Sequence, residues 1–152
     1  MGTYRRLNVA SGRQLEKLAH YSRALRVGDT VLQSGTTAID RQGNVRGEGD
    51  VAAQVEAIMR IAEWSMGKAG GRLADVVRCR LYITDVGQAD RAARAVARYF
   101  RDTRPTNTLV QVSGLARPEL LVEEEVTAIK GAHANIEWIA ADTVDPLERR
   151  RS

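Results

Sequence analysis

The chain has 152 residues, of which 43% are hydrophobic and 28% are charged, and its formal net charge is +4 at pH 7. This length supports one domain with a sizeable core and is too short for two such domains. Acidic and basic residues are interspersed, and Arg149, Arg150 and Arg151 supply much of the positive excess. The charge pattern therefore disfavours a nucleic acid as the partner.

Cys79 is the only cysteine, which excludes an intramolecular disulfide and is typical of proteins in a reducing compartment. The N-terminal residues contain no apolar run of signal-peptide length. No segment approaches the roughly 18 apolar residues that a membrane span needs. We therefore expect a cytoplasmic protein that does not contact a membrane.

The first third of the chain predicts three strands. Residues 3–8 alternate weakly, as in a short edge strand, and a polar linker through Leu15 and Glu16 follows. Residues 21–27 and 30–35 predict two strands, and the Gly28-Asp29 pair between them suits a two-residue hairpin turn. This is the most local strand pairing that the sequence predicts.

An amphipathic helix should follow the polar loop at residues 40–49. Asp50 is a suitable N-cap residue, and Gly70-Gly71 ends the helix. The apolar residues recur at spacings of three and four: Val51, Val55, Ile58, Met59, Ala62 and Met66. Such a stripe could fill a groove on a partner, but its ordinary role is to pack against a sheet. Trp64 lies off the stripe.

Residues 76–85 predict a strand that places Cys79 on its apolar face, with Val77, Leu81 and Ile83. A nucleophilic cysteine needs a neighbouring base, and neither histidine is tied to Cys79 by the sequence, so a buried structural thiol is expected. His20 and His133 are isolated, and we expect no metal site and no cofactor.

A second helix is predicted over residues 88–100. It should turn Ala89, Ala92, Ala93, Val96 and Phe100 inward, and Arg91, Arg94, Arg98 and Arg101 outward. The arginine stripe is compatible with nucleic-acid binding. Because no aromatic residues interleave with it to stack bases, a solvated basic face is the favoured interpretation.

Residues 105–130 predict two alternating strands, joined as a hairpin by a turn that contains Gly114 and Pro118. One face of the first strand holds Thr108, Val110 and Val112, and the other holds Asn107, Leu109, Gln111 and Ser113. On the second strand, Val122, Val126 and Ala128 alternate with Glu123, Glu125 and Thr127. The polar face of this hairpin is a candidate wall for a small-molecule site.

The predicted order of elements gives an α+β fold in which both helices cover one face of a single mixed sheet. The uncovered face would carry a set of mixed polarity: Arg78, Arg80, Tyr82, Asn107, Leu109, Gln111, Glu123 and Thr127. Self-association around a shared, partly polar centre would cover such a face. Residues 131–152 should form an extension, with a short strand or helix at 136–141 and a disordered end.

Several segments resemble the YjgF/Rid family of reactive-intermediate deaminases over residues 19–130. They are Gly28-Asp-Thr-Val-Leu-Gln-Ser-Gly35, Val51-Ala-Ala-Gln-Val55, Ala69-Gly-Gly-Arg-Leu-Ala-Asp-Val-Val77, Leu81-Tyr-Ile-Thr-Asp85, Tyr99-Phe-Arg-Asp-Thr-Arg-Pro105 and Leu115-Ala-Arg-Pro-Glu-Leu-Leu-Val-Glu123. The resemblance implies a chorismate-mutase-like fold, one domain over residues 1–130, and a homotrimer whose sheets form a central barrel. It also implies clefts at the subunit interfaces, where imines and enamines such as 2-aminoacrylate are hydrolysed without a metal or organic cofactor.

The resemblance implies roles for individual residues. Tyr21 matches the tyrosine of the cleft, Ser34 and Gly35 match the segment that lines it, and Glu123 matches the acidic residue thought to position water. Asn107 stands where the family has an arginine that holds the substrate carboxylate. A neutral amide replaces a charged bidentate fork there, which weakens carboxylate binding by a few kcal/mol.

The loss of this arginine and a second departure from the family, Glu124, each allow more than one interpretation. Arg80 is expected to bind substrate in place of the missing arginine, with Arg78 and Arg117 as alternatives. Glu124 points to the helix side, where the family has an apolar residue. A buried carboxylate needs a partner or a proton, so Glu124 is expected to be exposed at an edge or salt-bridged, and otherwise to belong to a site that other family members lack.

The sequence thus favours an enzyme that acts on a small imine, enamine or related carbonyl compound in a catabolic or biosynthetic pathway. The expected partners are a small-molecule substrate and two further copies of the chain. A trimer that binds a metabolite without turnover is the alternative. An RNA-binding or ribonuclease function, as in some relatives, has the weakest support.

Overall fold

The structure, a computed structural model, describes residues 5–139. Its elements in chain order are β1 (Arg6–Val9), α1 (Gln14–Leu18), β2 (Ala24–Val27), β3 (Thr30–Thr37), α2 (Val51–Lys68), β4 (Val76–Ile83), α3 (Ala89–Phe100), β5 (Thr106–Gln111) and β6 (Val122–Ile129). Short 3₁₀ turns precede β4 at Leu73–Asp75 and α3 at Val86–Gln88. The predicted α+β class is confirmed.

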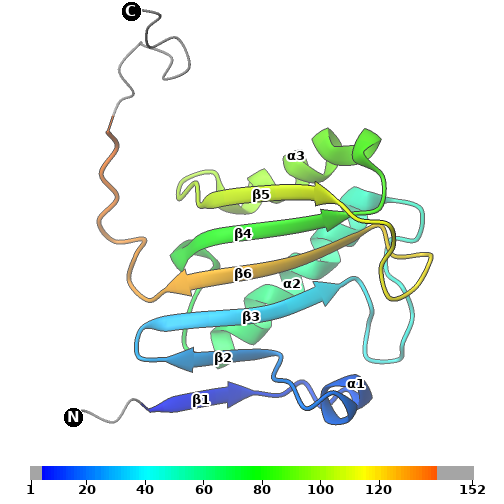
Figure 1. The fold of residues 1–152 in the computed structure, drawn as a ribbon. Helices are drawn as coiled ribbons and strands as arrows, with labels where there is room; N and C mark the ends of the chain where they lie inside the picture. The colour runs from blue at the N-terminus through cyan, green and yellow to red at the C-terminus, as the bar shows by residue number, and fades with distance from the viewer. Residues whose placement is uncertain (1–4, 140–152) are drawn as a thin grey trace, which may run out of the picture.

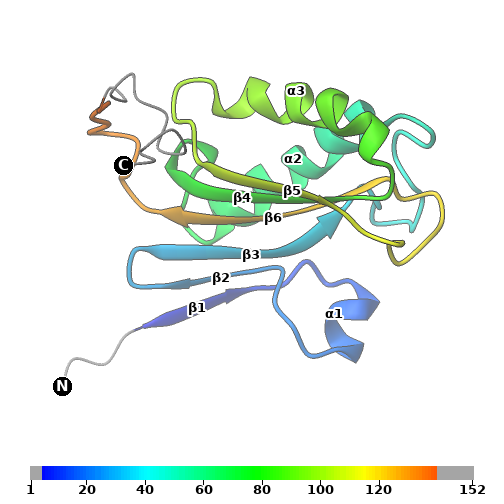
Figure 2. The ribbon, with the colours of Figure 1, turned by 45° about the horizontal axis from the view of Figure 1, so that its top comes forward.

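Six strands form one mixed sheet in the order β1-β2-β3-β6-β4-β5 (Figure 1). All neighbouring pairs are antiparallel except β4 and β5, which are parallel. The predicted β2–β3 hairpin is present, with Val27 opposite Thr30 around the Gly28-Asp29 turn. Helices α2 and α3 lie together on one face of the sheet, and α1 lies beyond the end of β1 (Figure 2).

The predicted hairpin of residues 105–130 is wrong, because β4 lies between β5 and β6. The connection between them runs around the end of β4: Val112 N donates to Ile83 O, and Thr84 N donates to Leu121 O. The segment 112–121 is long enough to connect β5 to β6 around this end of β4. The alternation of each strand was visible in the sequence, whereas the strand that separates them comes from a distant segment.

The predicted face of β5 is also wrong. In the parallel pairing, Asn107 lies beside Cys79 and Leu109 lies beside Leu81, and these two β4 residues are buried in the core under the helices. Neighbouring residues on paired strands point to the same face. Asn107, Leu109 and Gln111 therefore face the helices, and Thr108 and Val110 share the open face with Arg80 and Tyr82.

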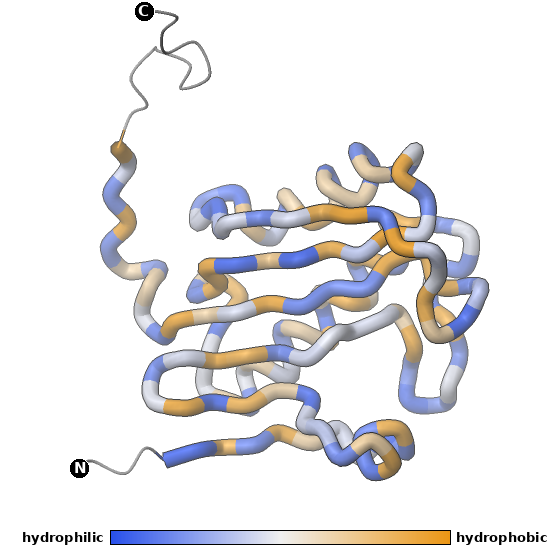
Figure 3. The backbone as a smooth tube through the Cα atoms, viewed as in Figure 1, coloured by the Kyte–Doolittle hydropathy of each residue, from blue (hydrophilic) through white to orange (hydrophobic). Residues whose placement is uncertain are grey.

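The core lies between the sheet and the two long helices. The predicted stripe of α2 is buried, and Asp50 caps this helix by accepting from the backbone N of Ala52 and Ala53. The inward face of α3 is shifted from the prediction: Ala95 is buried and Ala93 is exposed. Polar and apolar residues alternate along β4, and β6 is hydrophilic over Glu123–Glu125 (Figure 3).

Three further predictions concern the ends of the fold. The linker expected through Leu15 and Glu16 is instead helix α1. Residues 136–139 form neither a strand nor a helix, and the disordered end expected within 140–152 lies outside the described residues. No helix within residues 5–139 is long and apolar enough to cross a membrane.

Candidate active site on the open face of the sheet

Glu123 stands on the open face of β6, beside Tyr82 of β4 and Thr37 of β3. Its carboxylate lies directly over the backbone of Gly35, so that a Cβ at this glycine would overlap Oε1 and lie 3.2 Å from Cδ. Only glycine leaves room for the observed position of the carboxylate. The structure thus brings together Glu123 and Gly35, two of the residues expected from the sequence.

Gly35 belongs to an irregularity in β3, where the register with β6 shifts between Gln33 and Thr36. Such bulges redirect a strand and often lie next to functional sites. Ser34 is held there from both ends: its backbone N donates to Arg23 O, and its Oγ donates to Ser22 O at 2.7 Å. The Ser34 hydroxyl therefore serves the local backbone in this structure.

Arg23 connects Tyr21 to the backbone around Gly35. Nη2 of Arg23 donates to the Tyr21 hydroxyl at 2.8 Å, and its Nη1 donates to Gly35 O at 2.9 Å and to Thr36 Oγ1 at 3.0 Å. The guanidinium also lies 5.3 Å from the centre of the Tyr21 ring. Arg23 therefore fixes the positions of Tyr21 and Gly35 relative to each other.

Arg23 is itself buried, with 4% of its surface exposed, and is balanced by a buried carboxylate on α1. Glu16 accepts from Arg23 Nε at 3.1 Å and from Ser11 N and Oγ at 2.8 and 2.5 Å. Burial raises the pKa of Glu16, but these hydrogen bonds outweigh burial and hold it below its ordinary value. Sequence reasoning missed this pair because no periodic pattern marks two charges seven residues apart in a short irregular segment.

The Glu123 carboxyl group has a raised pKa and, within the described residues, no ion-paired or hydrogen-bonded partner. Burial raises the pKa of Glu123 above the ordinary glutamate value. The positive charge of Arg23 lowers this pKa in part, and the negative charge of Glu125 on the same face raises it further. Within residues 5–139 no hydrogen bond or ion pair occupies the Glu123 carboxylate, which is half-buried. A carboxylate with a raised pKa and free oxygen atoms can take a proton from water and return it.

Arg80 faces the same side of the sheet, but its charge is already engaged. Its Nη1 donates to Glu125 Oε1 at 2.5 Å, and both side chains are partly exposed. Of the two alternative cations, Arg117 donates to Gly43 O and pairs with Glu119 at 3.3 Å. Arg78 is exposed, and no ion pair within the described residues involves it.

Asn107 does not join this site within one chain. It is exposed on the opposite face of the sheet, in a hollow of about 480 Å³ beside α3, where Arg98, Arg101 and Arg104 are its neighbours. The cations that share this hollow with Asn107 come from α3 and the loop after it. Sequence reasoning did not find them because the face of β5 was predicted incorrectly.

Glu124, the next residue on β6, is 1% exposed on the helix side of the sheet. The prediction that it is exposed or salt-bridged is wrong: within the described residues its one partner is Cys79, whose Sγ donates to Oε1 at 3.3 Å, and Oε2 has none. Burial raises the pKa of Glu124 to about 7, although the hydrogen bond from Cys79 lowers it. The predicted burial of Cys79 is confirmed, and burial together with Glu124 raises the thiol pKa.

The arginine stripe on α3 is largely neutralised by nearby acids. Arg91 pairs with Asp50 at 2.9 Å, Arg98 with Glu56 at 2.9 Å and Arg94 with Asp90 at 3.4 Å. These pairs reduce the charge that the helix offers to a phosphate backbone. Within residues 5–139, no group of three or more His, Cys, Asp or Glu side chains could hold a metal ion.

Comparison with known proteins places this geometry in a family. The family model described as endoribonuclease L-PSP matches residues 11–130. The 3-aminoacrylate deaminase RutC of Acinetobacter baylyi is 32% identical over 106 residues, covering 70% of this chain and 83% of the relative.

Two solved structures are similar in fold and sequence. The crystal structure of Rv2704 from Mycobacterium tuberculosis, a member of the YjgF/YER057c/UK114 family, is 38% identical with a TM-score of 0.75, covering 82% of this chain and 99% of that one. A putative endoribonuclease from Thermotoga maritima, TM0215, is 27% identical with a TM-score of 0.69, covering 81% and 91%. The chain therefore belongs to the YjgF/Rid family, which the endoribonuclease L-PSP model describes.

Proposed function

We propose that the protein hydrolyses a small imine or enamine at the open face of the sheet, with Glu123 as the catalytic residue. The observation that carries this proposal is the Glu123 carboxylate itself, which lies over Gly35 with a raised pKa and has no partner within residues 5–139. The deaminase name of the RutC relative supports the same reaction class.

The reaction needs one group that moves a proton between water and nitrogen. An enamine first takes a proton at carbon, loses one from nitrogen and so becomes an imine. Glu123 accepts a proton from water as the oxygen bonds to the imine carbon, and it then returns the proton to nitrogen. The product of this addition is a carbinolamine. Glu123 then takes the proton of its hydroxyl group and delivers it to the amino nitrogen as the carbon–nitrogen bond breaks, so that ammonia leaves and a carbonyl compound remains. A base with a pKa closer to neutral than an ordinary carboxylate suits both transfers.

The cleft would form between copies of the chain. Glu123 and Asn107 lie on opposite faces of the same sheet, so a single cleft that contains both positions needs two chains. The open face also exposes Leu32 and Val110, at 41% and 43%, and burial of such residues favours association. Both features support the homotrimer with interface clefts that the family resemblance implies.

The substrate should differ from a standard amino-acid-derived imine. Asn107 offers a neutral amide, and Arg80 is already paired with Glu125. We propose that Tyr21, the Ser34-Gly35 backbone and Arg80 hold the substrate, with any carboxylate bound less tightly than an unpaired arginine would bind it. A larger or less anionic imine is the preferred substrate class.

The test is ammonia release from freshly generated 2-aminoacrylate and from larger imines. Wild-type protein should accelerate release from at least one imine, and Glu123→Gln should lose about a hundredfold or more of that rate, because general acid–base catalysis contributes about 10²- to 10⁴-fold. Glu63→Gln is the control, since Glu63 is exposed on α2. Asn107→Arg should improve the rate with 2-aminoacrylate. Failure of wild type and Asn107→Arg on every imine would contradict the proposal.

A trimer that binds a metabolite without turnover is the second candidate. Asn107 favours it, because loss of the carboxylate-holding arginine weakens the activity expected of the family. Under this alternative, a small ligand binds saturably while ammonia release stays at the background rate. Glu123→Gln then leaves unchanged any activity of the protein in cells.

A further inference from the structure

A second hollow lies away from Glu123, against α2. Its volume is about 590 Å³, within the range of small-molecule pockets. One wall is α2, and the others come from the segment around α1 and from the loop after β3. The lining residues are Ser11, Arg13, Arg23, Ala38, Ile39, Asp40, Arg41, Arg46, Ala53, Glu56, Ala57, Arg60, Ile61 and Trp64.

Five arginines and two acids line this pocket, and the acids are already occupied. Asp40 pairs with Arg46 at 2.8 Å. Glu56 pairs with Arg98 of α3, which lies outside the pocket. Arg23 is balanced by Glu16. Within residues 5–139, no carboxylate forms an ion pair with the remaining three arginines, which are Arg13, Arg41 and Arg60.

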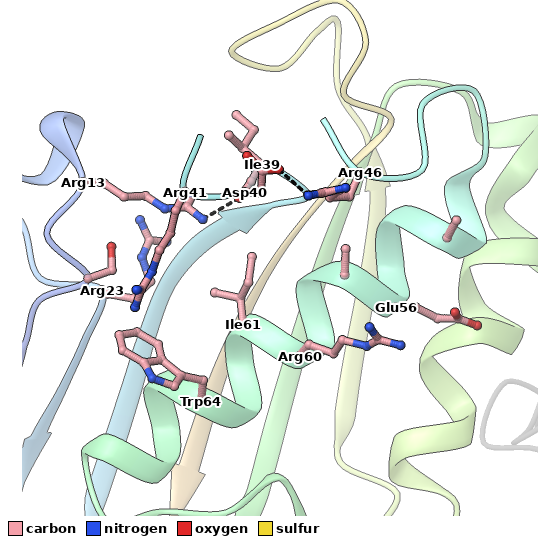
Figure 4. A pocket seen from close by; sticks show the side chains of 14 residues that line it. Arg13, Arg23, Ile39, Asp40, Arg41, Arg46, Glu56, Arg60, Ile61 and Trp64 are labelled. Atoms are coloured by element: carbon pink, nitrogen blue, oxygen red, sulfur yellow. Dashed lines mark hydrogen bonds and ion pairs between the residues drawn. The ribbon is translucent and has the colours of Figure 1, made fainter. Parts of the chain in front are cut away.

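Arg13 is held in place by the fold. One of its Nη2 hydrogens is donated to Ile39 O, and the side chain is partly buried. Burial and, to a smaller extent, the charge of Arg23 lower the pKa of Arg13, while Glu16, Tyr21 and Asp40 oppose this change. Figure 4 shows Arg13, Arg23 and Arg41 gathered at one end of the pocket. A bound anion would relieve their repulsion.

An apolar surface adjoins these cations. On α2, Trp64 lies below the arginine group and Ile61 lies beside it (Figure 4), and Ala53 and Ala57 continue the same helix wall. Trp64 lies off the buried stripe of α2 and is half-buried, with part of the indole left toward the pocket. A flat ring can pack on an indole while its charged group meets the guanidinium groups.

We propose that this pocket binds a small planar anion, in which a carboxylate or phosphate is attached to a flat ring. Arg13 and Arg41 hold the anionic group, and Trp64 packs against the ring. Arg23 contributes its positive field, because its own hydrogen bonds go to Glu16, Gly35, Thr36 and Tyr21. Arg23 also contacts Tyr21 and Gly35 of the proposed catalytic site, but Arg13, Arg41 and Trp64, which bind the anion, are not part of that site.

Trp64 provides the measurement. The chain has two tryptophans, so Trp138→Phe leaves Trp64 as the only one. In this background, fluorescence is followed while benzoate, phenyl phosphate or neutral benzamide is added. We expect saturable quenching by at least one of the two anions, and the ratio of their affinities distinguishes a carboxylate site from a phosphate site. Benzamide should bind at least about tenfold more weakly, because it cannot form charge-assisted hydrogen bonds.

Substitutions then locate the site. Arg41→Gln and Arg13→Gln should each weaken anion binding by about tenfold, while Arg94→Gln, at an exposed position of α3 outside the pocket, should bind like the parent. Arg41 is exposed on a loop, so Arg41→Gln is expected to fold. It therefore tests the proposal even if Arg13→Gln does not fold. Equal binding of benzamide and benzoate, unchanged binding by Arg41→Gln, or no saturable quenching by either anion would overturn the proposal.

Discussion

Glu123 and Glu124 are adjacent on β6, yet they lie in opposite environments. Glu123 faces the open side of the sheet, half-buried over Gly35, and its carboxylate has no partner within the described residues. Glu124 faces the helices, is 1% exposed and accepts one hydrogen bond from Cys79. Because side chains alternate along a strand, one glutamate lies in a candidate reaction site and its neighbour lies in the closed core.

Burial raises the pKa of both carboxyl groups, so a raised pKa does not by itself identify the reacting one. Access to a substrate separates them. Glu124 is 1% exposed beneath the helices, whereas Glu123 is half-buried on the open face that carries Tyr82, Glu125 and Arg80. The comparison supports the proposed catalytic role of Glu123 and predicts that Glu124 lowers stability.

The largest effect should come from Gly35→Ala. The added methyl group overlaps the Glu123 carboxylate and displaces it, and misplacement of a catalytic group by about 1 Å can cost about a hundredfold in rate. Ammonia release measures this loss. Gly67→Ala is the matched control, because nothing lies within 4 Å of a Cβ at that position on α2. A Gly35→Ala variant with the wild-type rate would break the proposed geometry.

Replacement of Glu124 by leucine should stabilise the protein at neutral and alkaline pH. Below pH 4.5 the carboxyl is neutral in both states. Between pH 4.5 and about 7 the unfolded state ionises while the folded state keeps its proton, so the free energy of unfolding falls as pH rises.

The full cost above pH 7 is about 3 kcal/mol, because each pKa unit corresponds to about 1.4 kcal/mol. Urea unfolding at pH 4 and pH 8 should therefore show Glu124→Leu gaining about this much only at the higher pH. An equal change at both pH values would show that packing, and not the charge, determines the effect.

Cys79→Ala should have a smaller effect. It removes the one hydrogen bond to Glu124, which costs about 1 kcal/mol, and it raises the pKa of Glu124 further because that bond favours the charged form. The pH dependence of unfolding should shift to higher pH. If it shifts to lower pH, the assigned contact is wrong.

The smallest effect on stability should come from Arg80→Met. The Arg80–Glu125 pair is partly exposed, and exposed pairs contribute about 0–1 kcal/mol. If Arg80 binds substrate, KM should nevertheless rise several-fold while the midpoint of thermal unfolding hardly moves. An unchanged KM would remove Arg80 from the substrate-binding set.

The regular elements could be predicted from the sequence because their patterns are local. The α2 stripe, the Asp50 cap and the Gly28-Asp29 hairpin each depend on residues close in the chain, and all three are confirmed. The pairing of β5 was not predictable in this way. Its alternation fits either face, and only the distant strand β4 decides that Asn107 points to the helices.

The candidate site follows the same division. The position of Glu123 on the polar face of its strand follows from alternation, and its neighbour Gly35 was identified by resemblance to the family. Arg23 and Glu16 were missed, because their burial depends on an ion pair between α1 and the residue before β2, which leaves no periodic pattern. The arginine pocket was missed for the same reason, since its walls come from three separate segments.

The pH dependence of kcat/KM for ammonia release tests the central claim most directly. Glu123 must be ionised to take a proton from water, so the rate should fall at acid pH with an apparent pKa above 4.5. We expect Glu124→Gln to keep this acid limb and Glu123→Gln to lose it along with most of the rate. An acid limb that disappears in Glu124→Gln and persists in Glu123→Gln would contradict the assignment of Glu123 as the catalytic carboxyl group.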